Sequence, residues 1–341
     1  MTSPHGTAEE IARGAPGREH RVSVALCTYN GARYVEEQLD SFMAQTRRPD
    51  ELVVCDDIST DGTLTILAQF ARRATFPVRI ERNGSRLGST KNFEKAIGLC
   101  TGDLIATSDQ DDVWLPEKLA LCEAEFDALP ECGLVFTNAE VVDESLVPVG
   151  HQLWDAIHFG LRARWRARRG RVFEILLRQW LVTGATMVFR AEYRPVVLPI
   201  PDNWIHDGWI AFIIGALAPI GCVERSTVKY RQHAAQQIGG KKLSLRELYE
   251  LARKVGPDYF RLAHERYCLA QERLRALAPR LRNPEFLAMV ERKVAHQRRR
   301  LAIAESSSRL DKVTLTLAEL LHGGYHRYSP STTHFLKDLL F

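Results

Sequence analysis

The sequence lacks paired cysteines and a long uncharged segment, and each absence excludes a class of protein. Its 341 residues include seven cysteines, an odd number without a CxxC pair, so we expect neither a disulfide framework nor a zinc ribbon. The longest stretch without a charged residue, 208–223, has 16 residues, whereas a membrane-spanning helix needs about 20. Because glycine and proline interrupt this stretch, it is typical of a buried helix that continues into a buried strand.

Targeting and phosphate-binding signatures are also missing. Residues 1–20 contain no apolar core of a secretory signal, and together with unpaired cysteines this indicates a cytoplasmic protein. Neither GxGxxG nor GxxxxGK[ST] occurs, which argues against a dinucleotide oxidoreductase and a P-loop nucleotidase.

The net charge of +4 hides an uneven distribution. Residues 241–341 contain 20 Lys and Arg against 11 Asp and Glu, a net charge of +9, and residues 1–240 contain 26 against 31, a net charge of −5. The first two thirds of the chain are therefore acidic and the remainder is basic.

Apolar runs of two different periods alternate along the first part of the chain. The pattern predicts helices at 31–45, 61–73 and 87–100 between strands at 22–26, 51–55, 77–80 and 103–107. Such alternation predicts an α/β fold with a mostly parallel sheet covered by helices on both faces.

The pattern changes after Val142. Residues 143–170 are expected to form a loop-rich insertion, and 182–231 short strands with one helix. Helices alone are predicted from Leu243 onward, at 243–255, 258–278, 283–306 and 312–321. We therefore predict a flexible segment 1–20, an α/β catalytic domain 21–240 and a basic, all-helical extension 241–341.

Carboxylates gather where two predicted strands end. Asp56 and Asp57 end the second strand, and Asp109, Asp111 and Asp112 follow the fourth. Ligands of open parallel sheets bind at the carboxyl ends of strands, and crowded carboxylates repel one another unless a cation neutralises them. This pattern indicates Mg²⁺ or Mn²⁺ that is shared with substrate phosphates. The alternative, turn residues and helix caps, is strongest for Asp61.

Several motifs together resemble the family 2 glycosyltransferases of the GT-A fold. They are VSVALCTYNG (22–31), VVCDDISTDGT (53–63), LGSTKNF (87–93) and SDQDDVWLPEKL (108–119). TGATMVF (183–189), IHDGW (205–209) and YRQH (230–233) resemble the branch of rhamnosyltransferases of surface-polysaccharide assembly. The resemblance implies a Rossmann-like central sheet, here followed by the helical extension.

The resemblance also implies roles for individual residues. It implies that a nucleotide-sugar donor is bound by Thr28, Tyr29, Asp57, Asp109 and Gly184, the last with Thr183 near the acceptor. It implies that Asp111 and His233 hold Mg²⁺ or Mn²⁺, and that Asp207 is the catalytic base of an inverting displacement. Two residues depart from the family pattern: Cys27, beside the implied nucleobase, and Gly208, on the implied acceptor side.

The implied reaction is transfer of a single sugar, because the QxxRW signature of processive synthases is missing. By resemblance the donor is dTDP-rhamnose ahead of a UDP-hexose, and the acceptor is a hydroxyl of a glycan or lipid-linked saccharide. A nucleotidyltransferase is disfavoured because no GxGxRL-type loop follows the first strand. An inactive GT-A-like binding module is disfavoured because the implied metal and base residues are all present.

Two arginine clusters remain, six arginines within 161–171 and three at 298–300. A solvated helical face, a nucleic-acid surface and an anionic membrane surface each explain such clusters. With the transferase resemblance we expect peripheral contact with the inner face of the cell membrane and no nucleic-acid partner.

Overall fold

The computed structural model describes residues 20–233, 256–330 and 334–340. The predicted flexible segment, apart from His20, and the predicted helix at 243–255 lie outside these residues.

The described residues contain one mixed sheet of nine strands in the order β3-β2-β1-β4-β8-β6-β9-β5, with β7 paired to β6. The strands are β1 (Val22–Thr28), β2 (Glu51–Asp56), β3 (Val78–Arg82), β4 (Leu104–Ser108), β5 (Val113–Trp114), β6 (Leu134–Val142), β7 (Pro148–Gln152), β8 (Met187–Arg190) and β9 (Ile220–Arg231). β1 to β4 run parallel, and so do β6 and β9, whereas β8, β5 and β7 pair antiparallel to their neighbours. The predicted mostly parallel sheet is therefore confirmed.

Helices cover both faces of the sheet. The helices of the sheet region are α2 (Val35–Met43), α3 (Thr63–Arg73), α4 (Ser89–Leu99), α5 (Lys118–Ala128), α6 (Leu153–Ala156), α7 (Leu161–Ala167), α8 (Val172–Leu176), α9 (Arg194–Val197) and α10 (His206–Leu217). Along β1, Val24 and Leu26 face the apolar cluster under α2, α3 and α5, while Ala25 and Cys27 face the cluster under α4 and α10. This period-two division is what a strand buried on both faces requires.

Two predictions for the middle of the chain are confirmed in outline. The uncharged stretch forms α10 followed by β9, and α10 is buried along almost its whole length. The loop-rich insertion holds β7, α6 and α7 between loops. All seven cysteines are free thiols, and five of them are buried. No helix in the described part of the chain is both long enough and apolar enough to cross a membrane.

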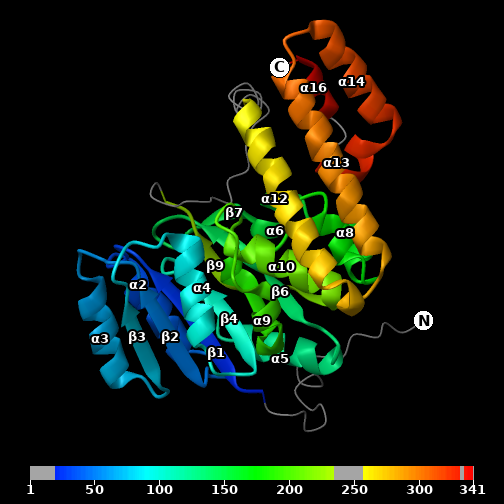
Figure 1. Ribbon diagram of the computed structural model, residues 1–341. Helices are drawn as coiled ribbons and strands as arrows, with labels where there is room; N and C mark the ends of the chain where they lie inside the picture. Colours follow the sequence, from blue (N-terminus) through cyan, green and yellow to red (C-terminus); the bar gives the residue numbers. More distant parts are fainter. Residues whose placement is uncertain (1–19, 234–255, 331–333, 341) are drawn as a thin grey trace.

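The described part of the C-terminal region is helical, as predicted. It consists of α12 (Pro257–Ala276), α13 (Glu285–Glu305), α14 (Arg309–Leu321), α15 (Gly324–Tyr328) and α16 (His334–Leu340). In Figure 1, α12 and α13 lie side by side with one end against the sheet region, and α14 and α16 lie toward their far end. Ala270 and Leu274 of α12 and Phe286 and Val290 of α13 join the apolar cluster that also contains α10.

Carboxylates neutralise much of both arginine clusters. Four arginines of 161–171 form ion pairs at 2.5 to 4.0 Å. Arg164 and Arg168 pair with Glu224, and Arg166 and Arg171 pair with Glu174. In α13, Arg299 pairs with Glu319, and the buried Arg300 makes a bidentate pair with Asp338 at 2.6 and 2.8 Å. Both clusters are therefore less positive than the sequence alone indicates.

Candidate active site

The carboxyl ends of β1 and β2 are joined by side-chain hydrogen bonds. Thr28, the last residue of β1, is buried, and its Oγ1 donates to Asp56 Oδ2 at 2.8 Å. Asp57, the residue after β2, accepts from the backbone N–H groups of Leu87 at 2.7 Å and Gly88 at 2.9 Å. Gly88 has a φ of +78°, a conformation that favours glycine, so the loop before α4 can turn its N–H groups toward Asp57.

Tyr29 is held from two sides. Gln110 accepts from the Tyr29 N–H at 2.9 Å and donates to the Tyr29 carbonyl at 3.0 Å. The Arg86 guanidinium lies over the Tyr29 ring, 3.7 Å from its centroid, and donates to the hydroxyl at 2.8 Å. The sequence did not single out Gln110 or Arg86, although Gln110 lies between the two acids implied to bind ribose and metal.

The acidic segment after β4 bends at Gln110 and Asp111, so it is not extended. Asp111 Oδ2 lies 2.7 Å from Nε2 of His233, which is the second residue after β9. Asp112 is buried, and its Oδ1 accepts from the Arg231 N–H at 3.0 Å while its Oδ2 has no partner. The structure thus brings together Asp111 and His233, which the sequence separates by 122 positions.

Burial and mutual repulsion dominate the electrostatics of this segment. Burial first, and then the neighbouring charges of Asp111 and Asp207, together raise the pKa of Asp109 to about 8, against the opposing charge of Lys118. The same causes, burial and then Asp111 and Asp109, raise the pKa of Asp112 well above its ordinary value. A divalent cation here would remove the repulsion that opposes ionisation.

The donor chemistry fits a divalent ion that a substrate helps to bind. Asp111 and His233 place an oxygen and a nitrogen side by side, and Asp112 Oδ2 is buried without a partner. Over the three described ranges, no group of three His, Cys, Asp or Glu residues is placed to hold a metal. Mg²⁺ is commonly held by one or two carboxylates plus substrate phosphates, and one histidine among oxygens suits Mn²⁺.

Asp207 occupies the first turn of α10 and is 6% exposed. Its Oδ2 accepts from the Gly184 N–H at 2.9 Å, and its Oδ1 accepts from Trp180 Nε1 at 3.2 Å and from the Gly208 N–H at 2.6 Å. A carboxylate offers about four acceptor positions, so one position on Oδ2 remains for a further donor.

Gly184 begins a short 3-10 turn before β8, and its surroundings explain the missing side chain. A Cβ on Gly184 would lie 2.6 Å from Nε2 of His206. His206 stacks on Phe93 with ring centroids 3.8 Å apart, and neither of its ring nitrogens has a partner. Gly184 therefore lets the chain pass close to His206 while its N–H reaches Asp207.

Lys118 is a buried cation near the acidic segment that sequence reasoning missed. Its Nζ donates to the Ala185 carbonyl at 2.5 Å and lies 3.5 Å from the centroid of the Trp114 ring. Burial lowers its pKa to about 7, although the charges of Asp112 and Asp109 oppose that shift. The residue stands in the motif SDQDDVWLPEKL, but an apolar helix face offers no signal that its lysine turns inward.

Comparison with known proteins identifies the family of this chain. Residues 23–195 match the model of glycosyl transferase family 2. A dTDP-rhamnosyl transferase of Shigella flexneri is 33% identical over 253 residues, 69% of this chain and 81% of that protein. The chain spans 59 to 66% of the length of the cyanobacterial and mycobacterial relatives that it matches at 26 to 28% identity.

Solved structures share the fold at low sequence identity. Residues 1–349 of Staphylococcus aureus TarS, in complex with UDP-GlcNAc, superpose with a TM-score of 0.57 at 17% identity, covering 94% of this chain and 81% of that one. A mannosyltransferase of Pyrobaculum calidifontis, in complex with GDP-mannose and Mn²⁺, gives a TM-score of 0.51 at 18% identity, covering 97% and 91%. The chain therefore belongs to glycosyl transferase family 2 and has the GT-A fold that its motifs imply.

Proposed function

We propose that this chain is a metal-dependent, inverting glycosyltransferase that moves one sugar from a nucleotide-sugar donor to a hydroxyl of a saccharide acceptor. One observation carries the proposal: Asp207, a buried carboxylate with one open acceptor position, accepts from the Gly184 N–H, and the Gly184 carbonyl accepts from Thr107 Oγ1 at 2.6 Å, two residues before Asp109. A proton acceptor and a carboxylate cluster suited to a cation thus meet at one edge of the sheet.

In this proposal the donor lies along the ends of β1, β2 and β4. Thr28, Tyr29 and Asp57 surround the base, Asp109 faces the ribose, and the backbone at Gly184 lies beside the transferred sugar. Asp111 and His233 hold Mg²⁺ or Mn²⁺, which when bound would neutralise charge on the diphosphate. The Mn²⁺ in the Pyrobaculum calidifontis mannosyltransferase supports a divalent ion in this fold.

Asp207 acts as the general base. As the acceptor oxygen forms a bond to the anomeric carbon, its proton passes to the open position on Asp207 Oδ2. The bond between that carbon and the donor phosphate oxygen breaks, and its electron pair leaves with the nucleoside diphosphate. Attack opposite the leaving group inverts the anomeric centre. Because the N–H groups of Gly184, Trp180 and Gly208 fix the carboxylate, little reorganisation accompanies proton transfer.

The proposed donor is dTDP-rhamnose, used in cell-surface polysaccharide synthesis. The printed activity of the Shigella flexneri relative, 33% identical over 69% of this chain, supports this donor. A UDP-hexose is the alternative.

Thermal-shift measurements with dTDP-rhamnose, UDP-glucose, UDP-GlcNAc and GDP-mannose, each with and without Mn²⁺, distinguish the two donors. We expect the largest stabilisation with dTDP-rhamnose and Mn²⁺, and stabilisation by none of the four contradicts the proposed function.

We further propose peripheral contact with anionic lipid at the inner face of the membrane. On α7, Leu161 is 82% exposed and Trp165 is 52% exposed, and Arg169 lies 3.9 Å from the centroid of the Trp165 ring. An exposed tryptophan beside a cation suits a bilayer interface.

Vesicles with 30% phosphatidylglycerol should bind the protein better than neutral vesicles. Trp165→Ser should weaken that binding, while the control Leu129→Ser, at a 44% exposed apolar residue directly after α5, should not. Equal binding to both vesicles overturns the idea.

A further inference from the structure

A cavity of about 280 Å³ lies between the segment 176–182, α10 and the C-terminal helices. Its volume is near the lower end of the range for small-molecule sites, which begins at about 300 Å³. Trp180 and Gly208 belong to its wall, so the cavity adjoins Asp207. Residues of the sheet region and of α12, α13, α15 and α16 line it together, and the described C-terminal helices therefore complete a site that the sheet region alone lacks.

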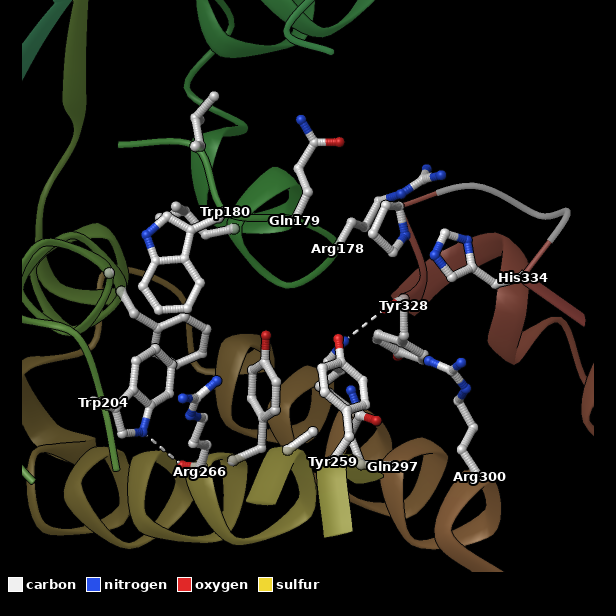
Figure 2. Close-up of a pocket in the computed structure, with 18 of the residues that line it drawn as sticks. Arg178, Gln179, Trp180, Trp204, Tyr259, Arg266, Gln297, Arg300, Tyr328 and His334 are labelled. Atoms are coloured by element: carbon white, nitrogen blue, oxygen red, sulfur yellow. Dashed lines mark hydrogen bonds between the residues drawn. The ribbon is translucent and has the colours of Figure 1, made fainter. Parts of the chain in front are cut away.

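The two ends of the cavity differ in chemistry, as Figure 2 shows. Trp180 and Trp204 lie together at one end, and Arg178, Arg300 and His334 lie toward the other. The two indole rings have centroids 6.0 Å apart, and Trp204 is fixed because its Nε1 donates to the Arg266 carbonyl at 2.9 Å. Flat aromatic faces of this kind are typical of small-molecule sites and accept the C–H face of a sugar ring.

The described lining is cationic and contains no acidic residue. It includes Arg178, Arg266, Lys293, Arg300 and Lys337 together with His334, and neither Asp nor Glu. Arg300 is neutralised by Asp338, which lies behind it. Arg178 and Lys293 form no ion pair within the described residues, so the positive charge of this end is not balanced internally.

Lys293 is the most unusual of these groups, because it is only 3% exposed. Among the described residues, its ammonium contacts the Tyr328 carbonyl, at 2.6 Å, and the face of the Tyr267 ring. Burial lowers its pKa well below the ordinary value, and the charges of Arg300 and Arg178 lower it further. Nearby, Gln297 is buried and its Oε1 has no partner. Within the described residues, a buried ammonium that lacks an anionic partner and a buried carbonyl oxygen that lacks a donor are costly unless a ligand supplies an anion and a hydroxyl.

We propose that this cavity is the acceptor site and that the acceptor is an anionic saccharide, with a phosphate or carboxylate substituent. Its sugar ring packs against Trp180 and Trp204, next to Asp207, and its anionic group pairs with Lys293 and Arg178. A hydroxyl of the same sugar donates to Gln297 Oε1. The inference rests on the proposed function, since it takes Asp207 as the base that receives the acceptor proton.

Calorimetric titration of the full chain tests the ligand class with four probes: glucose 1-phosphate, glucuronate, glucose and inorganic phosphate. We expect at least one of the two anionic sugars to bind about tenfold tighter than glucose, and also tighter than inorganic phosphate. Preference for the phosphate or the carboxylate sugar identifies which anion is recognised. If glucose binds as well as both anionic sugars, if inorganic phosphate binds as well as either, or if none binds, the proposal is wrong.

Variants locate the binding. Arg178→Gln and Lys293→Gln should each weaken binding of the anionic sugar about tenfold, whereas Arg298→Gln, an exposed cation on the same helix as Lys293 and outside the cavity, should not. Arg178 makes no described side-chain contact with an acid, so its variant remains informative if Lys293→Gln fails to fold. Equal affinity in Arg178→Gln and Arg298→Gln overturns the site. Binding of dTDP-rhamnose with Mn²⁺ is measured on the same samples. If the unaltered chain does not bind this donor, the proposed function is contradicted. If it binds the donor but no anionic sugar, only the proposal for the cavity is contradicted.

Discussion

The Trp180 ring occupies the space that a side chain at residue 208 would fill, because a Cβ on Gly208 would lie 2.1 Å from Trp180 Cζ2. Gly208 departs from the family pattern, and the departure has a partner 28 residues earlier in the chain. The missing side chain admits an indole whose N–H then reaches Asp207 at 3.2 Å.

Replacing Gly208 by alanine should therefore displace the Trp180 ring and release one hydrogen bond from Asp207. We expect transfer to fall roughly 10- to 100-fold in kcat, because a misplaced catalytic group loses most of its effect, while donor affinity stays unchanged. Steady-state kinetics measure both. In a Trp180→Ala background the same substitution should add little, since the clash is already gone. Additive losses would show that Gly208 acts independently of the indole.

Asp207→Asn should abolish proton acceptance while keeping most contacts of the site, because asparagine Oδ1 can still accept from Trp180 Nε1 and from the Gly208 N–H. We expect kcat to fall by roughly 10² to 10⁴ with donor binding within about twofold of the original. The exposed Asp202 gives a matched control, and Asp202→Asn should leave kcat unchanged. Near-normal turnover by the Asp207 variant would exclude this carboxylate as the base.

Gln110 positions Tyr29 through two hydrogen bonds, at 2.9 and 3.0 Å. Gln110→Ala should loosen the loop after β1 and weaken donor binding about tenfold, since each bond contributes roughly 1 kcal/mol. Turnover at saturating donor should change little, because the residue orders the binding loop and lies outside the reacting groups. A fall in kcat with unchanged donor affinity would assign Gln110 to the chemistry instead.

Metal affinity tests the pairing of Asp111 with His233. Removing either side chain, in Asp111→Asn or His233→Ala, should weaken Mn²⁺ binding in the presence of nucleoside diphosphate at least about tenfold. Electron paramagnetic resonance of free Mn²⁺ reports this directly. The exposed His322 serves as the control, and His322→Ala should bind Mn²⁺ normally. Normal affinity in both site variants would remove the pair as ligands.

His296 of α13 predicts a pH dependence of stability. Burial, with the charges of Lys293 and Arg300 on the same helix, lowers its pKa to about 4, against the opposing effect of Glu319 on α14. Tyr325 and Tyr328 of α15 pack on its ring, and Ser329 lies 3.2 Å from its Nε2. The unfolded chain takes up a proton near pH 6.5 and the folded chain only near pH 4, so stability falls as the pH drops between these values.

At pH 5 this linkage amounts to about 2 kcal/mol, at roughly 1.4 kcal/mol per pH unit. Urea unfolding of the original chain and of His296→Gln at pH 7.5, 6 and 5 measures it. The difference in unfolding free energy between the two proteins should shrink as the pH falls, because glutamine does not titrate. A difference independent of pH would show that His296 titrates alike in both states.

The sequence predicted the sheet, and indicated a candidate site at the carboxyl ends of its strands, because these signals are local. An apolar run followed by acids marks the carboxyl end of a buried strand, as at Asp56 and at Asp109, and parallel strands bring such ends together. Relations between distant segments were not predicted. Gln110 and Tyr29 are 81 residues apart, and nothing in either neighbourhood encodes their bidentate contact.

The sequence also fails to predict which charged side chains are buried and paired. Arg300 belongs to a run of three arginines that reads as an exposed basic surface, yet it is buried against Asp338, 38 residues away. The hydrogen bond from Trp180 to Asp207, 27 residues further along the chain, likewise has no signal in the sequence around either residue. Pairings of this kind depend on how helices pack, and helix periodicity fixes only which face is apolar.

Between Asp207 and His233 the chain consists almost entirely of α10 and β9, and β9 is hydrogen-bonded to β6 on one side and to β5 on the other. The proposed base and the proposed metal ligand are thus the two ends of one stiff connection. The backbone geometry of this connection sets their separation. Substitutions in α12, α13 and α16, which line the cavity, can therefore reshape the acceptor side without changing the spacing between proton transfer and leaving-group departure.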